Sequence, residues 1–146
     1  FTWKGKNPEL NPIVLLAHMD VVPVDPASEK SWTQPPFAGR IADGYVWGRG
    51  TADDKDKLAT MLMTMLLLKR SGVQLDRDVI FLAEAAEEAK TTAGIDFMVE
   101  QHFDEIDAEF AITEGGDATL EGGRVTTVNI GTAEKLPAPV RLRRAP

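Results

Sequence analysis

The amino-acid sequence predicts an α/β protein with a mostly parallel sheet and flanking helices, arranged as three α/β/α layers. Strand-like and helix-like segments alternate along the chain, which is typical of parallel strands joined by helical crossovers. The segments Ile13–Ala17 and Asp78–Ala83 are apolar almost throughout, as expected for strands that are covered on both faces. Between them, Lys55–Arg70 carries apolar residues at helical spacing.

Strands are expected where short apolar or alternating runs are bounded by turn residues. In order along the chain, they are Phe1–Trp3, Ile13–Ala17, Arg40–Ala42, Tyr45–Trp47, Asp78–Ala83, Glu109–Thr113 and Val125–Ile130. A loop rich in proline and polar residues occupies Pro23–Pro36, and Asp43–Gly44 is a strong signal for a two-residue hairpin turn. The strand at Glu109–Thr113 is expected to be buried.

Two helices are expected. Lys55–Arg70 has a wide apolar face and ends at Ser71–Gly72, where glycine allows the backbone to leave the helix. A shorter helix is expected from about Thr92 to Gln101, after a loop at Glu84–Glu88. These elements assign residues 1–135 to one domain and residues 136–146, rich in proline and arginine, to an irregular tail.

Composition narrows the class of function. The 146 residues are 43% hydrophobic and 27% charged, as in soluble globular proteins. The net charge of −7 argues against a nucleic-acid partner, and no apolar stretch approaches the ~20 residues that span a membrane. Because the sequence has no cysteine, any metal must be held by His, Asp and Glu, which suits zinc, manganese or cobalt.

The first candidate site residues follow an apolar strand, and open α/β sheets place their binding crevice at such strand ends. Side chains alternate along a strand, so His18 and Asp20 are expected on the same side. Asp20 can then accept a hydrogen bond from one imidazole nitrogen while the other nitrogen faces a metal ion. The alternative is a histidine that a local carboxylate holds at a strand end.

Asp53 and Asp54 precede the long helix. One of them can be an ordinary N-cap, because aspartate is preferred there and complements the helix dipole, but two adjacent carboxylates exceed what capping requires. Gly48 and Gly50 suggest a dinucleotide-binding loop. An aspartate at the position of the third glycine would repel a pyrophosphate, and this excludes that interpretation.

Glu87 and Glu88 follow a second apolar strand. In a turn, neighbouring side chains diverge, so one glutamate can bind a metal while the other faces water or substrate, as metal-assisted hydrolysis requires. The alternative is a solvated acidic loop, which is the interpretation for Glu84.

Glu114 ends a third strand, and the glycines after it allow the backbone to turn sharply. The alternative for Glu114 is a helix or turn cap. Asp117 is expected in a turn, and His102 is expected to interact with a helix C-terminus or the edge of the core instead of a metal. One histidine and several acidic groups therefore follow successive strands of one sheet.

Ordered motifs in the chain resemble the zinc carboxypeptidase and aminoacylase family of di-zinc exopeptidases, which includes glutamate carboxypeptidase, Gly-Xaa carboxypeptidase, aminoacylase and dipeptidases. The motifs are Leu16–Val24, Gly48–Lys55, Ala86–Glu88 and Thr113–Gly116, and Trp32 with Pro36–Phe37 also fits. The resemblance extends over roughly residues 1–135. It implies the N-terminal portion of a di-zinc peptidase catalytic domain.

The resemblance also implies roles for individual residues. The implied metal ligands are His18, Asp53, Glu88 and Glu114. Asp53 would bridge two zinc ions, with His18 and Glu114 on the first and Glu88 on the second. Asp20 would orient His18, Glu87 would be the general base, and the peptide bond between Asp53 and Asp54 would be cis.

The chain departs from the family pattern in several places. The family supplies a further histidine to the second zinc from later in the chain, and it has a smaller inserted domain for dimerisation, so a homodimer is expected only for a full-length form. Ala89–Lys90–Thr91 stands where the family favours small residues and glycine. Because the sequence has no initiator Met and changes character after Lys135, we expect a truncated or frame-altered piece of a longer protein.

The expected function is hydrolysis of a peptide or N-acyl-amino-acid amide bond next to a free carboxylate. Two zinc ions are expected in the complete enzyme, with cobalt or manganese as alternatives. A glutamate at position 114 favours the aminoacylase and Gly-Xaa carboxypeptidase side of the family. The alternative is a non-catalytic metal-binding fragment that lacks the last zinc ligand and the dimerisation domain.

Overall fold

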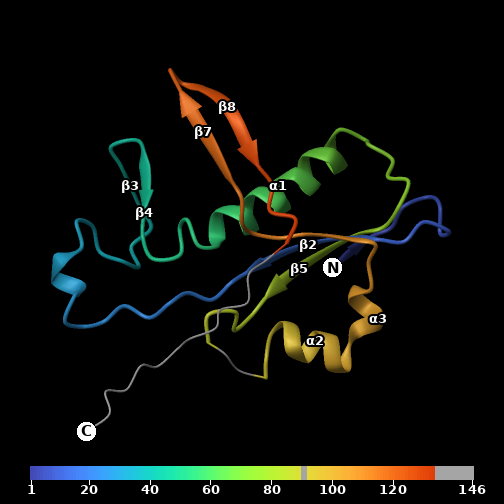
Figure 1. Ribbon diagram of the computed structural model, residues 1–146, viewed down its shortest axis with the longest axis horizontal. Helices are drawn as coiled ribbons and strands as arrows, with labels where there is room; N and C mark the ends of the chain where they lie inside the picture. The colour runs from blue at the N-terminus through green and yellow to red at the C-terminus, as the bar shows by residue number, and fades with distance from the viewer. Residues whose placement is uncertain (90–91, 134–146) are drawn as a thin grey trace, which may run out of the picture. The chain divides into compact units, whose positions relative to one another are not determined.

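The computed structural model describes residues 1–89 and 92–133 (Figure 1). The chain forms two compact units, Phe1–Glu114 and Gly115–Pro146, and the second is described as far as residue 133. The tail expected at residues 136–146 lies outside the described residues, as do Lys90 and Thr91. Within the described residues, the helices are too short or too polar to cross a membrane.

The first unit is built on a four-stranded sheet with the strand order β1-β5-β2-β6. These strands are β1 (Thr2–Trp3), β2 (Ile13–His18), β5 (Val79–Glu84) and β6 (Phe110–Ile112). β2 pairs in parallel with both β5 and β6, whereas β1 runs antiparallel to β5. The prediction of a mostly parallel sheet is confirmed.

The register of β2 and β5 brings their carboxyl ends to the same edge of the sheet. Ile13 lies opposite Val79, and His18 lies opposite Glu84. β2 therefore continues one residue beyond the expected strand and includes His18 itself. The loops that follow the two strands, with Asp20 in one and Glu87 in the other, leave the sheet side by side.

Helices cover both faces of this sheet, which confirms the three-layer arrangement (Figure 1). The helix α1 (Lys55–Arg70) has the ends that the sequence predicts and lies along one face, where Met65 packs into the core with Val14, Ala17 and Ile80. On the other face lie α2 (Ile95–Gln101) and α3 (Phe103–Ile106). The helix α2 begins later than expected, and α3 was not expected.

The prediction of a buried strand at Glu109–Thr113 is wrong. In β6 the side chains are exposed, including those of Phe110 and Ile112. The reason is the position of β6 at the edge of the sheet, where, in the described part of the chain, it pairs with β2 alone. An apolar run indicates a strand, but it does not tell an edge strand from a central one.

Two hairpins complete the described structure. β3 (Arg40–Ala42) and β4 (Tyr45–Trp47) form the predicted hairpin, with φ of 54° at Asp43 and 79° at Gly44 as a primed turn requires. A short 3₁₀-helix, η1 (Glu29–Ser31), lies in the preceding loop. In the second unit, β7 (Asp117–Glu121) pairs antiparallel with β8 (Arg124–Asn129). Asp117 therefore begins a strand and does not lie in a turn as expected.

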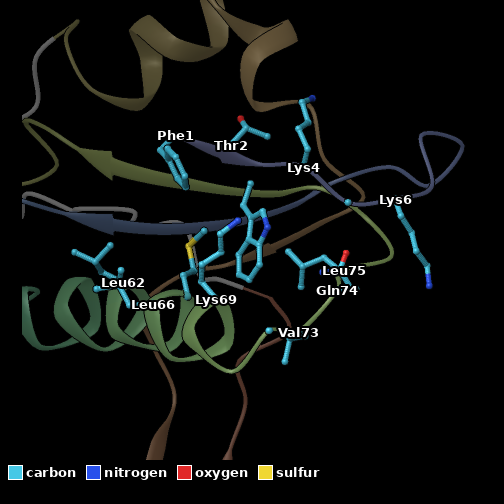
Figure 2. A pocket seen from close by; sticks show the side chains of 14 residues that line it. Phe1, Thr2, Lys4, Lys6, Leu62, Leu66, Lys69, Val73, Gln74 and Leu75 are labelled. Atoms are coloured by element: carbon cyan, nitrogen blue, oxygen red, sulfur yellow. The ribbon is translucent and has the colours of Figure 1, made fainter.

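A cavity of about 660 Å³ lies between β1 and α1, at the end of the sheet opposite to His18 (Figure 2). Its walls are largely apolar and include Leu62 and Leu66 of α1. The Lys69 ammonium lies 5.0 Å from the centre of the Trp3 ring, as a cation–π contact. Among residues 1–89 and 92–133, no His, Asp or Glu lines this cavity, so the hydrolytic chemistry that the sequence predicts is sought elsewhere in the described structure.

Candidate metal centre

His18 lies at the carboxyl end of β2, and its side chain is only 2% exposed. Its Nδ1 lies 3.1 Å from the backbone carbonyl oxygen of Asp20. A carbonyl oxygen can only accept, so Nδ1 carries the proton and donates this bond. The other ring nitrogen, Nε2, is then the one that can use its lone pair to bind a metal.

Carboxylates from several loops converge on Nε2 of His18. Asp53 Oδ1 lies 3.1 Å from Nε2, and Glu87 Oε2 and Glu114 Oε2 each lie 3.9 Å from it. The ligand atoms of His18, Asp53 and Glu114 all lie within 4.8 Å of one another. A second group, formed by His18, Glu87 and Glu88, meets the same limit.

The turn before α1 brings Asp53 to this position. Gly50 has a φ of +81°, and a Cβ atom there would lie 2.3 Å from Val21 Cγ1, so only glycine allows the turn to approach the loop after β2 this closely. The peptide bond between Asp53 and Asp54 is cis, as the family resemblance led us to expect. The next carboxylate, Asp54, is completely buried and accepts a hydrogen bond from the backbone N–H of His18 at 3.3 Å.

Asp20 uses its carboxylate differently from the sequence-based expectation. The carboxylate accepts hydrogen bonds from the backbone N–H groups of Glu87, at 3.2 Å, and Glu88, at 3.1 Å. Its Oδ1 is 3.5 Å from His18 Nδ1, which instead bonds the Asp20 carbonyl oxygen. Burial favours the neutral acid, but these hydrogen bonds to the backbone outweigh it and lower the pKa of Asp20. Asp20 thus ties the loop after β2 to the loop after β5.

Glu84 is not the solvated residue that the sequence suggested. Its side chain is buried, and its Oε1 accepts a hydrogen bond from the backbone N–H of Ile95 at 2.9 Å. Burial raises the pKa of Glu84, and the nearby carboxylates of Glu87 and Asp20 act in the same direction. Glu84 therefore closes the loop that carries Glu87 and Glu88 by holding the start of α2 against the end of β5.

The cluster concentrates negative charge around one buried imidazole. Burial raises the pKa of Glu114, as do the carboxylates of Asp54, Asp53 and Glu87. Burial alone would lower the pKa of His18, but its hydrogen bond to Asp53 and the charge of Glu114 raise it. The raised pKa of His18 favours the protonated ring when no metal is bound, with Nε2 facing Asp53.

This donor set fits a divalent cation. Zinc with bonds of 2.0–2.2 Å to nitrogen and oxygen places its ligands about 3.4 Å apart in a tetrahedral site. The separations from His18 Nε2, between 3.1 and 3.9 Å, bracket that value. The fit is best for the group His18, Asp53 and Glu114. Asp53 and Glu88, the pair expected on a second ion, fall in different groups.

Sequence reasoning did not identify Asp54, Glu84 or Lys57 as parts of this centre. One of Asp53 and Asp54 was treated as an N-cap, without a choice between them, and Glu84 was treated as a loop residue. The sequence did contain a signal for Asp54, because two adjacent aspartates exceed what helix capping requires. Glu84 gave no signal in the sequence, because its partner, the backbone N–H of Ile95, is set by the tertiary structure. Lys57 lies only three residues after Asp54, and this local spacing was not recognised.

One known protein family matches the sequence of this chain. The sequence profile described as "Peptidase family M20/M25/M40" matches residues 14–141. The chain belongs to this peptidase family. This M20 chain is 37% identical over 118 residues to a probable carboxypeptidase S-like 2 of Dictyostelium discoideum, which covers 79% of the chain and 22% of that protein. It is 34% identical over 127 residues to carboxypeptidase S of Saccharomyces cerevisiae, which covers 83% of the chain and 22% of that protein.

The chain is also similar to a protein named for N-fatty-acyl amino acids and to a metallo-carboxypeptidase of known structure. The N-fatty-acyl-amino acid synthase/hydrolase PM20D1 of Xenopus tropicalis is 34% identical over 139 residues, covering 92% of the chain and 27% of that protein. The crystal structure of the M20 family metallo-carboxypeptidase Sso-CP2 from Sulfolobus solfataricus matches with a TM-score of 0.58 and 20% identity, covering 79% of the chain and 25% of the neighbour. That structure shows a shared fold. The chain thus spans about a quarter of the length of these relatives.

Proposed function

We propose that the chain carries part of the catalytic centre of a zinc-dependent hydrolase that cleaves a peptide or N-acyl-amino-acid amide bond next to a free carboxylate. The observation that best supports this function is the convergence of three carboxylates on Nε2 of the buried His18. The relatives agree with it, since two are named carboxypeptidases and a third is named for N-fatty-acyl amino acids.

The residues present suggest how the centre would be divided. His18, Asp53 and Glu114 would hold one ion, and Glu88 would contribute to a second ion. When bound, zinc supplies Lewis acidity that polarises an amide carbonyl and lowers the pKa of water. The free carboxylate of the substrate needs a cationic partner, which we place in the part of the relatives' length that this chain does not span.

We assign the role of general base to Glu87. Its carboxylate lies at the edge of the cluster, 3.9 Å from His18 Nε2, and remains partly exposed to solvent. The hydrogen bond from its backbone N–H to Asp20 fixes the loop that carries it. In the proposed reaction, Glu87 accepts a proton from the attacking water and passes it to the leaving nitrogen.

A second candidate is a metal-binding fragment without hydrolytic activity. It is favoured by the separation of Asp53 and Glu88 into different groups, which leaves a second ion with few ligands from the described residues. Hydrolysis of N-acyl amino acids by the isolated chain distinguishes the two candidates, because only the first predicts turnover.

The metal content of the purified chain tests the proposed centre directly. We expect about one zinc or more per chain in the wild type and loss of zinc in Asp53→Ala, because Asp53 is the carboxylate closest to His18 Nε2. Asp96→Ala removes an aspartate from the first turn of α2, outside the cluster, and is expected to keep the zinc. A folded wild-type chain that binds no zinc would contradict the proposed function.

A further inference from the structure

Lys57, in the first turns of α1, contacts both neighbours of Asp53. Its Nζ donates a hydrogen bond to the backbone carbonyl of Ala52 at 2.7 Å. The same ammonium lies 3.7 Å from Asp54 Oδ1 and 3.1 Å from Asp56 Oδ1. One side chain therefore holds the residue before Asp53 and faces the residue after it.

Asp54 connects this ammonium to His18. The Asp54 side chain is 0% exposed, and its Oδ2 accepts the backbone N–H of His18. Within the described residues, Asp54 Oδ1 has no hydrogen-bond partner, and the Lys57 ammonium is the cation that faces it. A buried carboxylate without a compensating charge is strongly unfavourable. Lys57 thus stabilises the link through which the turn before α1 contacts the end of β2.

Lys57 remains charged in this environment. Burial lowers its pKa, but the hydrogen bond and charge of Asp56, followed by the charges of Asp54 and Glu114, raise it overall. A permanent cation near a metal centre can have two opposite effects. It can hold the ligand loop in position, which favours metal binding, or it can repel the incoming dication, which opposes binding.

We propose that Lys57 is a positioning residue for the metal centre, which sets the place of Asp53 relative to His18 by holding Ala52 and Asp54 on either side of it. The proposal rests on the proposed function in that it takes Asp53 and His18 as ligands. It adds a residue that touches neither the metal nor the substrate. If Lys57 positions Asp53, it strengthens metal binding, whereas simple charge repulsion by Lys57 would weaken it.

Amide hydrogen exchange in the metal-free chain tests the contacts without any metal. We compare Lys57→Met, the conservative Lys57→Arg, and Arg70→Met, which removes the same charge from the far end of α1. In Lys57→Met the His18 amide should exchange at least about tenfold faster, the size expected for a weakened hydrogen bond to a charged group. Lys57→Arg should restore most of the protection, and Arg70→Met should match the wild type.

Exchange at the amides within β5 is the internal reference. These amides should keep their wild-type rates in Lys57→Met, so that a local change is distinguished from a loss of global stability. Wild-type protection at His18 in Lys57→Met would overturn the proposal, whether or not the chain binds a metal. A uniform increase at His18 and β5 would also overturn it, because Lys57 would then be a general stabilising residue.

Titration with Co²⁺, followed by visible absorption, measures the consequence for the centre. We expect Lys57→Met to bind Co²⁺ at least about tenfold more weakly and with a changed absorption spectrum, because Asp53 is less fixed. Lys57→Arg should lie near the wild type. Tighter binding by Lys57→Met would show repulsion and would overturn the positioning role. A wild-type chain that binds no Co²⁺ would contradict the proposed function, and the exchange measurement would still decide the role of Lys57.

Discussion

At the residue scale, the centre depends on the two nitrogens of one imidazole. Nδ1 of His18 is committed to the carbonyl oxygen of Asp20, and Nε2 faces the carboxylates. Asp20 connects His18 to a second loop. Its carbonyl oxygen accepts the hydrogen bond from Nδ1, and its carboxylate accepts hydrogen bonds from the backbone N–H groups of Glu87 and Glu88. These bonds hold the backbone of both glutamates in place, and in the proposed reaction the side chain of Glu87 acts as the base.

Glu87→Gln tests that division of roles. We expect the variant to keep its zinc, because His18, Asp53 and Glu114 remain, and to lose at least about a hundredfold in the hydrolysis of an N-acyl amino acid, as is typical when a general base is removed. Zinc content and turnover are measured on the same preparation. Glu9→Gln, a change at an exposed residue outside the cluster, is the control. Loss of zinc in Glu87→Gln would show instead that Glu87 is a ligand in the group that it forms with His18 and Glu88.

At the scale of elements, local signals and tertiary contacts explain different parts of the structure. Both ends of α1 were predicted, because an acidic pair precedes the helix and Ser71–Gly72 follows it. The start of α2 was predicted too early, because it is fixed by the bond from Ile95 to Glu84 and not by a local cap. The strand β7 was missed, although Gly122–Gly123, both with positive φ, provide its hairpin turn.

In the candidate site, too, some features could be predicted from the sequence and others depend on tertiary contacts. His18, Asp53, Glu87 and Glu114 were predicted to lie together because their strands were expected to end at one edge, and the structure brings the carboxylates of Asp53, Glu87 and Glu114 within 3.9 Å of His18 Nε2. The contact between Asp20 and the backbone of Glu87 could not be predicted. It joins residues 67 positions apart and depends on the register of β2 against β5.

The junction between β5 and α2 can be tested at Gly94. Its φ is +74°, and an added Cβ would lie 2.1 Å from the carbonyl oxygen of Ala85, in the loop that carries Glu87 and Glu88. Gly72 is a matched control, since its φ is +72° and no atom of the described residues lies within 4 Å of its added Cβ. Both Gly→Ala variants strain the backbone by about 1–2 kcal/mol, and only Gly94→Ala adds a clash.

We therefore expect Gly94→Ala to lower the free energy of unfolding by at least about 1 kcal/mol more than Gly72→Ala, because the clash is with backbone and cannot be relieved by a rotamer change. Urea unfolding followed by circular dichroism measures both variants. Equal losses for the two variants would show that the loop after β5 can move away from α2 without affecting the rest of the fold.

At the scale of the whole molecule, the chain carries a net charge of −7, and part of that charge is gathered around His18. Mutual repulsion among buried or half-buried carboxylates opposes folding, and the raised pKa of Glu114, due to burial and then to the charge of Asp54, reflects this cost. In the metal-free chain, protonation of His18 would offset some of this repulsion. A bound dication would do so more completely, and zinc binding should therefore be linked to the stability of the entire fold.

The linkage has a definite dependence on pH. The pKa of His18 is raised in the fold, against the effect of burial, by Asp53 and Glu114, so its proton stabilises the metal-free chain below the ordinary histidine pKa, and this contribution is lost as pH rises through the raised value. Zinc requires the deprotonated ring, so a fall in pH weakens binding by up to about tenfold per unit while the metal-free state gains stability.

At a zinc concentration near 100 times its dissociation constant at pH 8, zinc should add about 2.7 kcal/mol to the free energy of unfolding, and this gain should shrink toward zero by pH 5.5. Urea unfolding with zinc and with a chelator, at both pH values, measures the difference. His102→Gln, at the far end of α2, should leave the dependence intact, whereas a zinc effect that is equal at pH 8 and pH 5.5 would show that His18 is not a ligand.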